Sequence, residues 1–233
     1  MSLPVGRRSS MSVLTDFSQL RSGTKKHLRN VYTSMTLCML GAFIGSYVHL
    51  MTQFRIDFLS VFLSIGLLGW LAATAHVKES QIKRLGILFA FGITSGLGLG
   101  PTLDFAIAID PQIVVTAFVM TTLIFISFSL SALFAQRRSF LYLGGFLGSG
   151  LMMLLFVSLV GAYDQSLASF KFYLYVSTAL FCAFVLYDTQ LIVEKHINGD
   201  NDYIWHSVDL FIDFLAIFRR LLIIFGVLKK SEN

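Results

Sequence analysis

Long apolar runs alternate with short polar connections along most of the chain. Seven runs are predicted to be helical: Val31–Met51, Phe58–Ala75, Leu85–Leu103, Ile113–Ala135, Phe140–Ala162, Phe172–Val193 and Ile204–Leu228. Their lengths are close to the roughly 20 residues that an α-helix needs to cross the hydrocarbon core of a bilayer. Backbone groups in lipid must bond within their own segment, and the runs lack the strict alternation of barrel strands. We therefore expect membrane-spanning helices.

Composition indicates the same solvent. Hydrophobic residues make up 55% of the 233 residues, charged residues make up 13%, and the mean hydropathy is +0.74. A soluble domain has about a quarter charged residues. We therefore predict an all-α membrane protein, a seven-helix bundle at 31–228, between a basic tail at 1–30 and a short basic end at 229–233.

The net charge of +5 is concentrated in the tail and in alternate connections. These basic residues are Arg7, Arg8, Arg21, Lys25, Lys26 and Arg29, then Lys78, Lys83 and Arg84, then Arg137 and Arg138. The third connection carries Asp104 and Asp110 without a base. The positive-inside rule therefore predicts a cytosolic amino terminus, and the pattern does not indicate nucleic-acid binding. Seven crossings would place Lys229 and Lys230 on the opposite side, whereas a re-entrant last segment would return them to the cytosol.

Glycine spacing indicates where helices approach closely. Gly41 and Gly45 are four residues apart in the first run, as are Gly144 and Gly148 in the fifth. Small residues at this spacing let helix backbones approach in lipid. The stretch SGLGLGP at 95–101 should end or loosen the third helix at membrane depth, because it combines alternating glycines with a proline.

Three aspartates lie inside the last two apolar runs. An ionised side chain at the centre of a membrane helix costs about 2.5–3.5 kcal/mol, so such residues normally face other helices. If the last two helices form a hairpin that turns near Gly199, Asp188 lies opposite Asp209 or Asp213. Distance from the turn slightly favours Asp209, whereas depth in the membrane favours Asp213. Two carboxylates in contact cannot both ionise cheaply, so the pair could act as a proton-sensitive latch or bind calcium. A local bond from each aspartate to a hydroxyl, an arginine or water is an equal alternative.

Other polar residues in these runs are secondary candidates. Arg219 and Arg220 follow the aspartates in LFIDFLAIFRRLL. The five histidines are scattered and include no pair spaced i,i+4, so we expect His206 to be solvated or locally bonded. No phosphate-binding loop, nucleophile elbow or zinc pattern is present, and no cofactor is predicted.

FVLYDTQLIVEK and GDNDYIWHSVDLFIDFLAIFRRLL resemble the carboxy-terminal signature of the Bax inhibitor-1 family. KHLRNVYTSMTLCML, KRLGILFAFGITSGLGLGP and LSALFAQRRSFLYLGG extend the resemblance over nearly the whole chain. The resemblance implies an endoplasmic-reticulum membrane protein that suppresses cell death and lets calcium leak from the store, with six helices around a central seventh. By motif position it assigns the family's pH-sensing aspartate pair to Asp188 and Asp213. Bacterial members are described as having an arginine at the end of the second helix that reaches this pair, and HVKESQIKRLG contains no single matching residue.

Intramembrane aspartyl proteases also pair a Tyr-Asp with a second aspartate. They require a Gly-x-Gly-Asp loop at the second aspartate, whereas this chain has FIDF around Asp213. We therefore predict that the chain is not an enzyme. Two alternatives to a calcium leak stay open: coupled calcium–proton exchange, and a non-conducting regulator that binds Bcl-2-type proteins or stress sensors. Expected partners are the lipid bilayer, calcium ions and those proteins.

Overall fold

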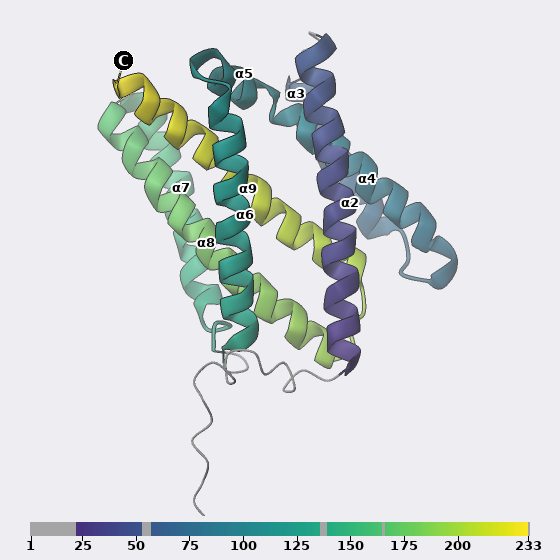
Figure 1. Ribbon diagram of the computed structural model, residues 1–233. Helices are drawn as coiled ribbons and strands as arrows, with labels where there is room; N and C mark the ends of the chain where they lie inside the picture. The colour runs from purple at the N-terminus through teal and green to yellow at the C-terminus, as the bar shows by residue number, and fades with distance from the viewer. Residues whose placement is uncertain (1–21, 53–56, 136–138, 165, 233) are drawn as a thin grey trace, which may run out of the picture.

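The computed structural model describes residues 22–52, 57–135, 139–164 and 166–232. This part of the chain contains eight α-helices and one short 3-10 helix, η2 (Lys78–Ser80) (Figure 1). The α-helices are α2 (Ser22–Thr52), α3 (Asp57–Ala73), α4 (Gln81–Gly98), α5 (Gly100–Ile109), α6 (Gln112–Phe134), α7 (Leu143–Asp164), α8 (Leu167–Ile197) and α9 (Tyr203–Glu232). The predicted class, all-α, is confirmed, and each predicted apolar run corresponds to observed helix.

The predicted count of seven helices is wrong, because the third run forms two helices. Helix α4 ends at Gly98 and α5 begins at Gly100, with Pro101 in the first turn of α5. The two axes differ by 44°. A proline has no N–H to continue the preceding helix, so the break falls within the SGLGLGP stretch, as predicted. Asp104 consequently lies within α5 rather than in a connection, and its carboxylate is 3.1 Å from Nε2 of His49.

The two ends of the chain also refine the prediction. Helix α2 begins at Ser22, so residues 22–30 of the predicted tail are helical, while residues 1–21 lie outside the described part. At the other end, α9 is continuous from Tyr203 to Glu232. Its carboxy-terminal end lies at the opposite end of the bundle from the start of α2 (Figure 1). The helix therefore shows no break, although it is not among the described helices that are apolar enough to span a membrane by length and composition.

Four described helices are long and apolar enough to cross a membrane, namely α2, α6, α7 and α8. The bent α4–α5 pair would form a fifth span, and the apolar part of α3 is shorter, at Leu59–Ala73. Large apolar side chains point outward, including Phe43, Phe62 and Phe156, which are each more than 60% exposed. Extensive outward-facing apolar surface marks contact with lipid or with other proteins, and together with the apolar helices it indicates a multi-pass membrane protein.

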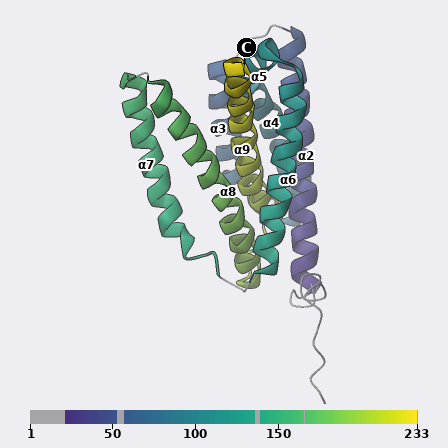
Figure 2. The same cartoon turned by 60° about the vertical axis from the view of Figure 1, so that its left-hand side comes forward.

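Helix α9 packs against α2, α4, α5, α6 and α8. Its fully buried side chains include Leu210, Phe211, Ile217 and Leu222. Helix α7, in contrast, packs mainly against α8 and lies at the edge of the bundle (Figure 2). The last helix therefore shares faces with most of the bundle, which places its polar residues among other helices rather than in lipid.

Glycines bring α2 and α4 into backbone contact. A Cβ atom on Gly41 would meet the carbonyl oxygen of Phe89, and one on Gly96 would meet that of Ala42. The prediction of close packing at Gly41 and Gly45 is therefore confirmed. The same prediction for the fifth run is wrong: a Cβ on Gly148 meets nothing within 4 Å, and one on Gly144 meets only the side chain of Tyr187.

We expect Gly96→Ala to lower the midpoint of thermal unfolding and Gly86→Ala to leave it unchanged or raise it. Both glycines lie within α4, but a methyl group at position 96 forces α2 and α4 apart, which typically costs about 1–3 kcal/mol. Position 86 has open space around it, and alanine favours the helix by about 1 kcal/mol. Thermal unfolding of the purified variants in detergent measures both effects. Equal loss in the two variants would mean that the α2–α4 contact is not the cause.

Candidate functional site

Asp188 and Asp213 face each other across α8 and α9. Their carboxyl groups are near enough to interact electrostatically. Asp213 is 3% exposed, Asp188 is half-buried, and Oδ2 of Asp213 has no hydrogen-bond partner among the described residues. The arrangement thus brings two acidic groups together inside the bundle, where an unpaired charge is poorly solvated.

The connection between α8 and α9 produces this register. Gly199 has φ +103°, a conformation that favours glycine, and it lets the chain reverse direction just after α8. The N–H of Asp200 donates to the carbonyl of Lys195 at 2.9 Å, and the N–H of Gly199 donates to that of His196 at 3.1 Å. These bonds satisfy the last carbonyls of α8 and fix where α9 begins.

Asp209 lies close to the pair but has a different partner. Its carboxylate is 3.9 Å from Nζ of Lys195, and both side chains are about one-third exposed. It also interacts electrostatically with Asp188. Both candidates that the sequence spacing left open, Asp209 and Asp213, interact electrostatically with Asp188, and Asp213 is the more buried of the two.

The two arginines of α9 lie apart from the aspartates. Arg219 is exposed. Arg220 donates from Nε to the hydroxyl of Ser177 at 2.8 Å, and its guanidinium lies 4.2 Å from the centre of the Phe181 ring. Arg220 is seven residues beyond Asp213, about 10 Å further along the helix axis. Its role in the structure is to join α9 to α8.

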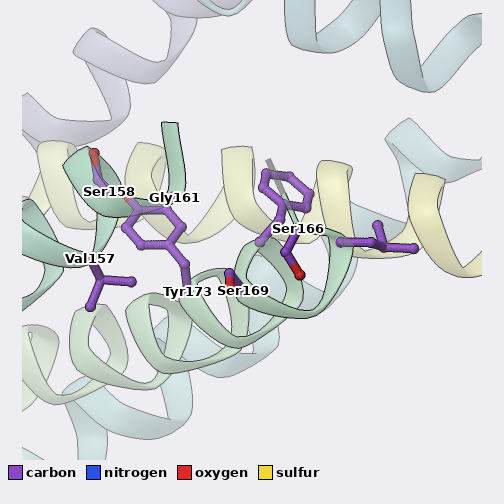
Figure 3. Close-up of a pocket in the computed structure, with 8 residues that line it drawn as sticks. Val157, Ser158, Gly161, Ser166, Ser169 and Tyr173 are labelled. Atoms are coloured by element: carbon purple, nitrogen blue, oxygen red, sulfur yellow. The ribbon is translucent and has the colours of Figure 1, made fainter. Parts of the chain in front are cut away.

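A cavity of about 480 Å³ lies between the end of α7 and the start of α8 (Figure 3). Its lining residues are Val157, Ser158, Gly161, Ser166, Leu167, Ser169, Phe170 and Tyr173. Tyr173 precedes Asp188 by 15 residues on the same helix, about 22 Å. The cavity is therefore remote from the aspartate pair.

An ion pair that the sequence did not predict lies near the connection. Arg84 of α4 is 2% exposed and donates from Nη1 and Nη2 to the two carboxylate oxygens of Asp202, at 2.8 and 2.6 Å. Nη1 also donates to Nδ1 of His76 at 2.7 Å. Arg84 was counted among the bases of the second connection, and this is wrong, because it lies within α4 and is buried. Its carboxylate partner lies 118 residues away, so no local pattern could identify it.

The electrostatics of this ion pair favour the charged state. Burial alone would raise the pKa of Asp202. The bonds from Arg84 and from the N–H of Trp205 outweigh burial and lower that pKa below its ordinary value. The pKa of Asp200 is likewise lowered despite burial, by the N–H of Asp202 and by His206. Both carboxylates of the connection are therefore ionised at neutral pH.

Three histidines that are scattered in the sequence come together at the same end of the bundle. The Nε2 of His27 and the Nδ1 of His206 share a hydrogen bond at 3.0 Å, and His196 stacks on His27 with ring centres 4.3 Å apart. His206 is fully buried, and its Nε2 is 3.4 Å from the carboxylate of Asp200. The expectation of a solvated or only locally bonded His206 is thus wrong, because its main partner is on α2. Among the described residues, no group of three or more His, Cys, Asp or Glu side chains is arranged to hold a metal ion.

Comparisons with known proteins agree over nearly the whole length. The family described as "Inhibitor of apoptosis-promoting Bax1" matches residues 24–230. A probable Bax inhibitor 1 of Paralichthys olivaceus is 50% identical over 97% of this chain and 96% of its own length. The Bax inhibitor 1 of Homo sapiens is 47% identical, with the same coverage. That of Arabidopsis thaliana is 38% identical over all of this chain and 92% of its own length.

Proposed function

Because this chain belongs to the Bax inhibitor family, we propose that it is an anti-apoptotic protein of the endoplasmic-reticulum membrane that lets calcium leak from the store. In this proposal the Asp188–Asp213 pair controls the leak in response to pH. The amino terminus faces the cytosol and α9 crosses the bilayer. The electrostatic interaction of these two carboxyl groups inside the bundle is the observation that supports the proposal.

The physical basis is the cost of holding two negative charges together. With one proton shared, the pair joins α8 to α9 by a hydrogen bond. With both groups ionised in a poorly hydrated site, the carboxylates repel each other or attract a cation. Loss of the shared proton therefore separates the helices and frees oxygen ligands at the same step.

Calcium is the transported ion in this proposal rather than a resident cofactor. A bound calcium takes about six to eight oxygen ligands, and two carboxyl groups supply at most four. Such a pair can hold the ion briefly with water completing its shell, as a conducting site requires. The proposal includes no catalytic step.

Two other functions use the same features. Coupled calcium–proton exchange would also require carboxyl groups that bind either a proton or a cation. A non-conducting regulator that binds Bcl-2-type proteins or stress sensors is supported by the names of the relatives, which are Bax inhibitors. Calcium flux from liposomes that contain only the purified protein separates the regulator from the other two, because a regulator gives no flux at any pH.

Asp213→Asn should remove most of the pH dependence of calcium flux in these liposomes. Asparagine keeps the volume of the side chain and can still hydrogen-bond, but it cannot titrate. Asp110→Asn, at the C-terminal cap of α5, is the matched control and should keep the original profile. If folded Asp213→Asn retains the original profile, the pair is not the sensor.

A further inference from the structure

The short connection between α8 and α9 is attached to other helices by charged and aromatic side chains. We propose that Arg84 clamps this connection through Asp202 and thereby positions Asp213 against Asp188. Arg84 is then a positioning residue that acts on the pair from a distance. Its functional consequence rests on the proposed calcium leak, whereas its effect on helix register does not.

The contacts of Asp202 are those of a junction. Its carboxylate accepts hydrogen bonds from both terminal nitrogens of Arg84 in α4. Its Oδ1 also accepts a hydrogen bond from the N–H of Trp205, in the first turn of α9, at 3.1 Å. A guanidinium and a carboxylate that meet through two parallel bonds fix orientation as well as distance. Rotation or sliding of α9 would break at least one of these bonds.

Other groups around the junction limit how else α9 can be held. His76 lies 3.5 Å from the carboxylate of Asp202, on the side of Arg84. His206 of α9 bonds to His27 of α2, so α9 has a second attachment one turn later. The carboxylate of Asp200 accepts the N–H of Asp202 within the connection and lies 3.4 Å from Nε2 of His206, and Lys195 faces Asp209. Of these contacts, the Arg84–Asp202 pair is the one that joins the connection to α4 by opposite full charges.

A shift at the connection reaches the aspartate pair because α9 is continuous. Asp213 follows Asp202 by 11 residues, about 16 Å along the axis. Sliding by one residue displaces Asp213 by about 1.5 Å and rotates it by about 100° around the axis. Asp213 would then no longer face Asp188.

The helix register can be measured without any flux assay. Spin labels on Ala179 of α8 and Ile212 of α9, both exposed, report the position of α9 relative to α8. Ile212 is next to Asp213, and Ala179 is nine residues before Asp188, about 13.5 Å along the axis. The labels are attached to cysteines introduced at these two positions. The two native cysteines are therefore first replaced in the full chain, as Cys38→Ala and Cys182→Ala. The variants are Arg84→Gln, Asp202→Asn, both together, and Arg84→Lys, with Asp200→Asn as the matched control.

We expect Arg84→Gln and Asp202→Asn to shift the label distance by at least about 1.5 Å or to broaden its distribution, and Asp200→Asn to leave it unchanged. Arg84→Lys should restore part of the original distribution, because lysine keeps the charge but not the paired geometry. The double variant should differ little from the singles, because each single already breaks the contact.

Flux against pH then tests the functional consequence. Disruption of the clamp should move the midpoint of the flux profile by about one pH unit, the effect of about 1.4 kcal/mol on the pair. If the ion pair has only a structural role, its loss lowers the yield of folded protein. The protein that does fold then keeps the original midpoint of the flux profile. The Arg84 variants keep every other charged or titratable group named around the clamp and the pair, so a shifted midpoint is attributed to the clamp. These groups are His76, Lys195, Asp200, His206 and Asp209.

An unchanged label distance in folded Arg84→Gln overturns the inference, and so does an equal shift in Asp200→Asn. If Arg84→Gln and Asp202→Asn do not fold, the comparison of Arg84→Lys with Asp200→Asn decides by the same two criteria. A shifted distance together with no flux in any variant supports the clamp and contradicts the calcium leak. The two proposals therefore fail by different observations.

Discussion

Asp202→Asn is expected to lower the free energy of unfolding by about 3–5 kcal/mol at neutral pH. The substitution leaves Arg84, which is 2% exposed, without the carboxylate that accepts two of its hydrogen bonds. An uncompensated buried charge is far more destabilising than the intact pair is stabilising. Chemical unfolding in detergent micelles, with the original chain in parallel, measures the loss.

The same variant has a defined pH dependence. The pKa of Asp202 is lowered in the folded protein, so its stabilising contribution is fully present above the ordinary value of about 3.9. That contribution is lost as the pH falls through the folded pKa, and the difference between the two proteins should disappear in acid. Asp200→Asn is the control and should lose no more than about 1 kcal/mol, because its carboxylate is half exposed. A similar loss in both variants would contradict a special role for Asp202.

Asp188→Asn and Asp213→Asn are each expected to remove most of the pH dependence of calcium flux, and the double variant should add little. If the two carboxyl groups share one proton, changing either group removes it, and the second change has nothing left to remove. Groups in one hydrogen-bonded unit behave non-additively, whereas distant groups add within about 0.3–0.5 kcal/mol. The measurement is flux against pH for the two singles and the double.

Asp209→Asn is the comparison for this cycle. Asp209 pairs with Lys195 and is one-third exposed, so we expect it to act separately from the shared proton. Additive effects of Asp188→Asn and Asp213→Asn would mean that no proton is shared. Strong coupling of Asp188 to Asp209 instead would mean that α9 has a different register in the membrane.

The helices could be predicted because length and hydropathy act locally. A run such as Ile113–Ala135 has one stable form in lipid, and the structure has α6 at Gln112–Phe134. The break at Leu99 was also visible in the sequence, because glycines and a proline weaken a helix wherever they occur. What could not be predicted was that the two pieces would count as separate helices with a 44° bend, which depends on packing against α2 and α9.

The candidate site was only half visible for a related reason. Aspartates inside apolar runs are conspicuous, but the choice between Asp209 and Asp213 depends on helix register, and spacing from Gly199 alone does not fix it. The contact from His27 to His206 joins residues 179 apart, so it depends on the tertiary fold. Arg84 follows Lys78 and Lys83 in a polar stretch of the sequence, so it looks like a basic residue of a connecting loop. Only the tertiary structure shows its partner, Asp202.

The peripheral position of α7 has a consequence for how this protein tolerates change. Only 11% of its apolar span is buried, and its main neighbour is α8. A helix that is solvated mainly by annular lipid is selected for hydrophobic length rather than for the shape of each side chain. Apolar residues can therefore replace one another along most of α7, and the helix can separate from α8 locally while the packing around α9 stays intact. Sequence drift in this family should accumulate first on that outer helix, and last along the seam between α2 and α4, where even a methyl group is too large.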